Sequence, residues 1–179
     1  MARSTGTVKQ FARQKILCNE LEINGSPVGD STVLYEYLPG YGRQVTKSST
    51  IASAPDALFD VTGKCMVTLM FGEVTSVIAT STSLSLNTST NNQVIAASTQ
   101  ITTDAAGTLY WVSGDPDLAL NGADTPGIDA AFMKVGTLAP MIFNDDQIEM
   151  NVNSAGTGLI EWTLYYLPLE DGATIAAAA

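Results

Sequence analysis

The side chains that could do chemistry in this sequence are carboxylates and thiols, because the chain contains no histidine. Histidine is the commonest general base and the usual partner of a nucleophilic serine or cysteine, so its absence excludes both of those catalytic arrangements. Two pairs of adjacent acids remain, Asp145-Asp146 and Glu170-Asp171, and glycosidases work with two carboxylates. An enzyme that used Asp145-Asp146 would need a concave pocket and a raised carboxyl pKa. Adjacent acids in turn-like sequence are usually solvated, and we therefore predict that the protein is not an enzyme.

An acidic loop at 113–129 offers a second kind of chemistry, the binding of a hard cation by oxygen atoms. An EF-hand loop would have Asp or Asn where Ala119 stands and glycine where Leu120 stands, so that motif is absent. Glycine-rich phosphate-binding motifs are absent as well. We expect a solvated loop and no cofactor, and a structural calcium ion remains the alternative. The carboxylates of this loop are Asp115, Asp117, Asp124 and Asp129.

Aromatic side chains suggest a third possibility, a platform on which a sugar ring could stack. The candidates are Tyr110-Trp111 and Trp162 with Tyr165-Tyr166. Adjacent residues on a strand point to opposite faces, so in each adjacent pair at least one ring is expected to face the core. We favour core packing over a sugar platform.

The start of the chain and the cysteines indicate the cellular compartment in which the protein is made. The opening residues contain no apolar signal-peptide core, and no later stretch approaches the roughly 20 apolar residues that cross a bilayer. We therefore expect synthesis in the cytoplasm and no contact with a membrane. Cys18 and Cys65 lack CxxC spacing, so we expect two reduced structural thiols, with a disulfide or a metal site as the alternative.

The elements that must position these side chains are strands. Apolar and polar residues alternate in short runs separated by Gly, Pro, Asn and Ser, and helical periodicity is almost absent. About eight or nine such strands predict an all-β fold, an antiparallel β-sandwich or jelly roll. The predicted strands are 32–38, 65–71, 73–79, 83–87, 94–97, 99–102, 107–112, 148–152 and 160–166.

Two local features refine this prediction. Gly72 stands between two predicted strands, where a missing side chain would allow a bulge or a sharp bend. The strands 148–152 and 160–166 flank the turn sequence NSAGTG, which predicts a β-hairpin. The 168–179 tail that follows is too small and apolar to form a core of its own.

Charge divides the chain into a basic arm, residues 1–17, and one acidic body, residues 18–179. The arm contains no acid, whereas residues 48–179 contain fourteen acidic residues and only Lys64 and Lys134 as cations. The formal net charge of −10 argues against nucleic-acid binding by the body. We expect the arm, as a helix at 7–17 or as an extended segment, to dock on another protein. Its predicted partner-binding residues are Arg3, Val8, Lys9, Phe11, Arg13, Lys15 and Ile16.

A run without any charge extends from Val74 to Thr103 and is rich in Ser and Thr. Charge is the usual device that prevents one strand edge from pairing with another. The run is expected either to form a core sheet with a Thr-rich outer face or to be buried against identical subunits.

Two segments carry a resemblance to a known group of proteins. They are ALFDVTGKCMVTLMFGEVTSVI at 57–78 and GTGLIEWTLYYLPLEDGATIAAAA at 156–179. Over about a quarter of its length the chain thus resembles the capsid decoration or cement proteins of tailed bacteriophages, which are small β-structured virion proteins. The shared pattern is a VTG-strand-GEVT segment together with a C-terminal strand that ends in Y-x-P-L-[ED]-DG-A.

The resemblance implies a non-enzymatic structural protein on the outer surface of the capsid, commonly a homotrimer, that bridges neighbouring subunits of the major capsid protein. It brings no catalytic residue and no small-molecule substrate. The alternative is a phage tail or adhesion module that binds a host-surface carbohydrate through the 113–129 loop. Loss of glycan binding on replacement of Trp111 or Tyr110 would favour that alternative.

Overall fold

The chain forms two units, and each is described by itself. The computed structural model describes residues 22–23, 26–27, 42–52, 55–115, 117, 120 and 140–179. The first unit, residues 1–37, contains an antiparallel pair of β1 (Glu22–Ile23) and β2 (Ser26–Pro27). The basic arm and the strand predicted at 32–38 lie outside the described residues. The other described strands belong to the second unit, residues 38–179.

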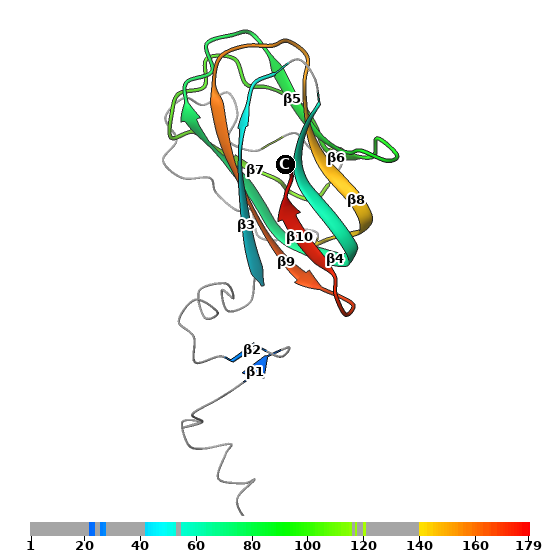
Figure 1. Cartoon of the computed structure of the whole chain (residues 1–179). Coiled ribbons are helices and arrows are strands. Elements are labelled where there is room, and N and C mark those ends of the chain that lie inside the picture. Colours follow the sequence, from blue (N-terminus) through cyan, green and yellow to red (C-terminus); the bar gives the residue numbers. More distant parts are fainter. Residues whose placement is uncertain are drawn as a thin grey trace, which may run out of the picture. The chain divides into compact units, whose positions relative to one another are not determined.

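One long strand, β4 (Asp56–Ser76), organises the second unit. Along one edge it pairs with β8 (Met141–Val152) through its first half and with β7 (Leu109–Trp111) near its end. Along the other edge it pairs with β9 (Leu159–Pro168) through its second half and with β10 (Thr174–Ala177) near its beginning. All four partners run antiparallel to β4 (Figure 1). Each edge of β4 is therefore covered by two strands in succession, β8 and β7 along one edge and β10 and β9 along the other.

The remaining strands extend the sheet on both sides. β3 (Arg43–Thr50) pairs with β9, β5 (Ser83–Thr88) pairs with β8, and β6 (Val94–Gln100) pairs with β5. The resulting 8-stranded sheet has the order β3-β9-β4-β8-β5-β6, with β7 and β10 attached to β4. Every pairing is antiparallel, and the described residues contain no helix. The predicted all-β, sandwich-like fold is confirmed.

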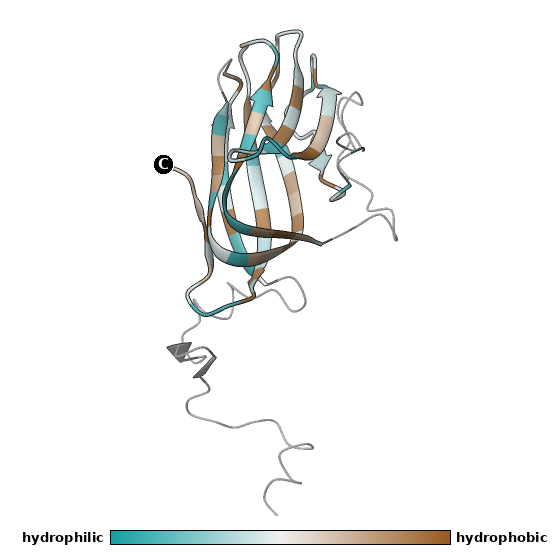
Figure 2. Ribbon diagram, turned by 90° about the vertical axis from the view of Figure 1, so that its right-hand side faces the viewer, coloured by the Kyte–Doolittle hydropathy of each residue, from teal (hydrophilic) through white to brown (hydrophobic). Residues whose placement is uncertain are grey.

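Both halves of β4 and the strands that follow it contribute to one hydrophobic core. It contains Leu58 and Phe59 from the first half of β4, Met70 and Val74 from the second half, and side chains from each of β5 to β10. Hydrophobic and hydrophilic residues alternate along the strands (Figure 2), which is how a sheet presents one apolar face. The largest buried ring, that of Trp162, packs against Tyr110 at a centroid distance of 6.4 Å.

Two glycines explain local features of β4, and one of them corrects a prediction. The register passes through Gly72 without interruption, so the bulge predicted as one possibility there is wrong, and one strand runs through both predicted segments. An added Cβ at Gly72 would lie 2.9 Å from the Trp162 ring, so packing requires this glycine. The register is instead irregular between Val61 and Lys64, where Gly63 has φ +66, a left-handed conformation that favours glycine.

The predicted β-hairpin at the end of the chain is wrong in its pairing. β8 and β9 are both strands, as predicted, but both pair with β4, on opposite edges. The 153–158 connection crosses between them and is held by other segments, since Gly156 N–H donates to the Ile51 carbonyl and Asn153 N–H to the Ser83 carbonyl. Alternation and turn residues predict that two strands exist, whereas the long β4 between them determines the pairing.

Part of the uncharged run becomes interior sheet, whereas β6 lies at the end of the strand order. β5 lies between β8 and β6, and its Leu84, Leu86 and Thr88 side chains are buried. This geometry agrees with the core-sheet interpretation for β5. Val77 and Val94 are the large apolar residues of the run that stay exposed.

Candidate functional site

The adjacent acids that sequence analysis considered for catalysis are structural hydrogen-bond acceptors. Asp145 Oδ1 accepts from the Gly63 N–H at 2.7 Å, and Glu170 Oε1 accepts from the Lys64 N–H at 2.9 Å. Both carboxylates thus hold the irregular segment of β4. Asp146 serves another element, because its Oδ1 accepts from the Thr90 N–H and hydroxyl in the turn between β5 and β6. The neighbouring acids at 145 and 146 therefore do not work on a common atom.

The ionisation of Asp146 also argues against acid catalysis. Burial, the largest single effect, raises its pKa, but the backbone N–H groups of Gln147, Thr90 and Ser89 and the Thr90 hydroxyl together outweigh burial. The pKa of Asp146 is therefore lowered from its ordinary value of 3.8. A general acid at neutral pH would need the opposite shift. Asp146 is instead a fixed negative charge.

The acidic loop at 113–129 and Cys65 were the other candidates for chemistry. The Asp115 carboxylate accepts from the Asp117 N–H at 3.0 Å and so orders its own turn. Within the described ranges, no group of three or more His, Cys, Asp or Glu residues could hold a metal ion, and Asp124 and Asp129 lie outside those ranges. Cys65 is a buried free thiol whose pKa is raised by burial and by the negative charge of Glu170, against a lowering by Arg43.

The aromatic residues considered for a sugar platform are core residues. Tyr110 and Trp162 are fully buried, and Trp111, Tyr165 and Tyr166 are each less than one-tenth exposed. The Tyr110 hydroxyl donates to the buried Asp104 carboxylate at 2.7 Å. Core packing, which the sequence favoured for these rings, is confirmed.

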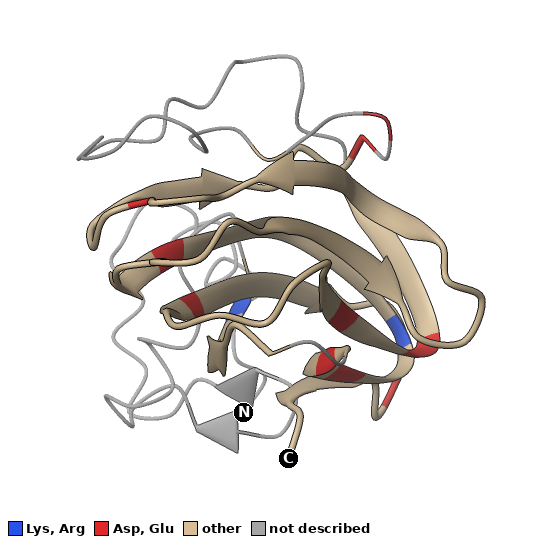
Figure 3. Cartoon of the chain, turned by 90° about the horizontal axis from the view of Figure 1, so that it is seen from above, with Lys and Arg blue, Asp and Glu red and all other residues tan. Residues whose placement is uncertain are grey.

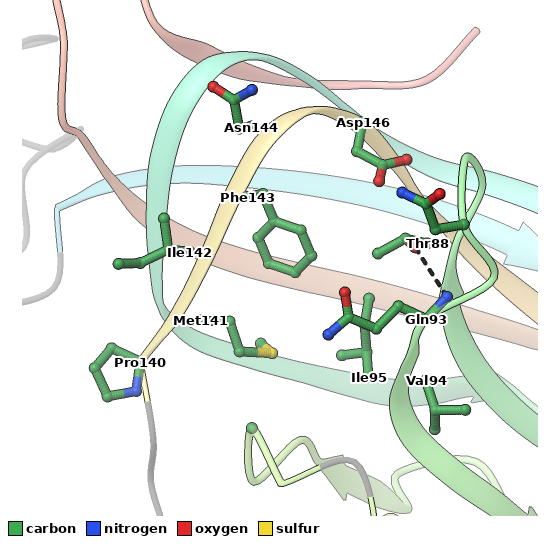
Figure 4. Close-up of a pocket in the computed structure, with 12 residues that line it drawn as sticks. Thr88, Gln93, Val94, Ile95, Pro140, Met141, Ile142, Phe143, Asn144 and Asp146 are labelled. Atoms are coloured by element: carbon green, nitrogen blue, oxygen red, sulfur yellow. Dashed lines mark hydrogen bonds between the residues drawn. The ribbon is translucent and has the colours of Figure 1, made fainter.

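A groove lies where β8 separates from the β5–β6 hairpin. β5 pairs with β8 only from Ile148 to Val152, so no strand in the described part of the chain pairs with the second edge of residues 141–146. The space beside this open edge is a cavity of about 380 Å³, and Figure 4 shows the Phe143 ring directed into it. We call this the β8 groove. It is lined by Thr88, Asn91, Gln93, Val94, Ile95, Gly114, Pro140, Met141, Ile142, Phe143, Asn144 and Asp146.

The β8 groove combines an apolar floor with a polar, negative rim. Of the large hydrophobic residues exposed in the described body, Ile142 at 63% and Val94 at 39% both line it. Amide side chains and the ionised Asp146 complete the rim, and no lysine or arginine is among the lining residues. Acidic residues also outnumber basic ones along the rest of the described body (Figure 3). The β8 groove therefore places an apolar surface beside hydrogen-bonding side chains and one fixed negative charge.

The sequence pattern did not predict this site, because it placed the start of the strand at residue 148. The run Pro140-Met141-Ile142-Phe143 is apolar without alternation, and the acids after it were interpreted as a turn. In the structure, Asp145 has φ +44 and stays within the strand. The predicted arm residues, from Arg3 to Ile16, lie outside the described residues.

No helix within the described ranges is long and apolar enough to cross a membrane. Comparison of the chain with protein-family models, with curated proteins and with solved structures finds no match.

Proposed function

We propose that this protein is a non-enzymatic structural component of a tailed-phage particle. It decorates the outer surface of the capsid and stabilises it by bridging neighbouring subunits of the major capsid protein, as a homotrimer whose N-terminal arm docks on the particle surface. The observation that carries the proposal is the division of charge between a cationic segment at 1–17 and an acidic β-body. The resemblance of the 57–78 and 156–179 segments supports it.

A decoration protein needs no chemistry, because binding alone stabilises the shell. A protein that binds only the assembled lattice shifts the equilibrium toward that lattice by mass action. The described body suits such a role, since its carboxylates hold backbone segments and its aromatic rings fill the core. The carbohydrate alternative depends on the 113–129 loop, most of which lies outside the described residues, while Tyr110 and Trp111, the positions that would test it, are buried.

Binding to purified shells that lack this protein tests the proposal. We expect the full-length chain to sediment with shells, to raise their melting temperature, and to be released by salt as charge pairing is screened. Deletion of residues 2–17 should abolish binding and leave the β-body folded, as judged by circular dichroism. Undiminished binding of the deletion variant would rule out the arm as the tether, and no binding of the full-length chain would rule out decoration.

A further inference from the structure

The open edge of β8 is suited to receive an added strand. A strand edge without a partner presents unpaired N–H and C=O groups, and an extended segment can pair with them while a neighbouring pocket takes one of its side chains. Residues 141–146 supply such an edge in the described body, and the cavity beside Phe143 supplies the pocket. By contrast, the edge strand β3 carries Arg43 and Lys47, the kind of charged side chain that discourages strand addition.

The chemistry of the β8 groove restricts what can bind there. Its apolar floor, with Phe143 and Ile95, suits one bulky apolar side chain, and the ionised Asp146 on its rim suits a cation beside that side chain. A second acidic body would be repelled. The occupant is therefore a basic, extended segment with a central apolar residue.

Residues 7–17 of this chain have that pattern. Side chains two positions apart share a face in an extended chain, so Lys9, Phe11 and Arg13 would lie together, with the phenyl ring between two cations. The segment precedes β3 by enough residues to reach another molecule, since 25 residues separate 17 from 43 and an extended chain covers roughly 3.3 Å per residue.

We propose that residues 7–17 of a second copy add as a strand along residues 141–146 of β8, with Phe11 in the cavity and a neighbouring cation, Lys9 or Arg13, beside Asp146. This inference deepens the proposed function by naming the part of the particle surface on which residues 7–17 dock, a neighbouring decorating copy. It rests on the proposed function only in placing copies side by side on a particle. The arms would then link decorating copies to one another, so that each copy reinforces the hold of its neighbours on the shell.

The mass of the purified full-length protein in solution, without shells, is the first test. We expect an oligomer at low salt that dissociates toward the 18.8 kDa monomer in about 1 M salt, where the Debye length is roughly 3 Å. Ile142→Lys should also give a monomer, because it places a cation beside the incoming basic segment. Ile142 is 63% exposed, so its replacement should leave the fold intact.

A matched control and a charge reversal make this test specific. Val77→Lys introduces the same charge at another exposed apolar position, 51% exposed and outside the lining of the groove, and should leave the oligomer intact. The variant Lys9→Glu/Arg13→Glu should be monomeric, because it places two acids beside the fixed negative charge of Asp146. A monomeric wild type, or an oligomer that Ile142→Lys does not weaken, would overturn the proposal.

A photo-crosslinker in place of Ile142 identifies the occupant. Mixing isotope-labelled and unlabelled protein before irradiation separates links between copies from links within one chain. Mass spectrometry should find mixed-isotope links from position 142 to residues 7–17. Links to 116–139, or links confined to one isotope, would overturn the proposal. Because no shell is present, a failure here is distinct from a failure of shell binding.

Discussion

At the scale of single residues, the structure gives specific reasons for residues whose role the sequence left open. Gly72 is required by the ring of Trp162, which occupies the space where its side chain would be. Asp146 is required by the turn between β5 and β6, whose backbone it holds. In both cases the partner lies more than fifty positions away in the chain, so only folding brings the two together.

Replacing Gly72 by alanine should destabilise the body. The new Cβ would lie 2.9 Å from Trp162 and 3.1 Å from Ile160 Cγ2, and both side chains are fully buried. Overpacking of this kind costs about 1–3 kcal/mol, measurable by urea unfolding. In a double-mutant cycle with Trp162→Phe, which shortens the ring system, the two costs should sum to more than the cost of the double variant. Strict additivity would mean that Trp162 is not the obstacle.

The lowered pKa of Asp146 predicts a dependence of stability on acid. A carboxyl group whose folded-state pKa is depressed contributes stability above its unfolded pKa and loses it as pH falls through the folded value. The free energy of unfolding should therefore decrease below about pH 4. Asp146→Asn should be less stable than the wild type at pH 7 and should decline less steeply in acid. Parallel acid profiles for the two proteins would contradict this assignment.

At the scale of elements, β4 is the central strand with which β7, β8, β9 and β10 all pair. One of its cross-strand pairs is unfavourable. Glu73 on β4 lies directly opposite Glu161 on β9, and both side chains are exposed. The other cross-strand neighbours of these residues are Leu109 and Ser48, which are uncharged. Like charges directly opposite each other destabilise a sheet.

Glu161→Lys should therefore stabilise the body by about 0.2–1 kcal/mol at low salt, because it turns a repulsive pair into an attractive one. Glu149→Lys is the matched control, since it makes the same change in net charge at a position opposite Ala57 and Asn87. Thermal unfolding of both variants measures the difference. Equal shifts in both would show that net charge, rather than the Glu73–Glu161 pair, is responsible.

At the scale of the whole molecule, the charge division makes salt act in opposite directions on folding and on association. The body repels itself, since the formal net charge is −10 for the whole chain, and becomes −14 when deletion of 2–17 removes four cations. Salt screens this repulsion and also screens attraction between the arm and an acidic partner.

The melting temperature of the variant that lacks residues 2–17 should therefore rise with added salt at pH 7. The effect should shrink near pH 4, where the carboxylates become neutral and the charge falls. Over the same range of salt, the full-length protein should dissociate from shells. Differential scanning calorimetry and sedimentation measure the two effects, and a melting temperature that falls with salt would contradict the account of self-repulsion.

Much of the fold could be predicted from local pattern. Alternation of Ser83, Leu84, Ser85 and Leu86 predicted β5, and the strands at 148–152 and 160–166 were placed where β8 and β9 run. The prediction failed where a long-range neighbour determines the outcome, as in the pairing of β8 with β4 rather than with β9. Periodicity contains no information about which strand lies beside which.

The sequence by itself determined the all-β class, the division into a basic arm and an acidic body, and the exclusion of histidine-dependent catalysis, because these depend on composition and on period-two alternation. Only the tertiary structure decided that the acids at 145 and 146 serve different segments, that Gly72 accommodates Trp162, and that residues 141–146 have one edge, beside a cavity, with which no described strand pairs. Each of these depends on residues that are distant in the chain and adjacent in space. Contacts of that kind arise when the sheet folds across one core, and a local pattern does not encode them.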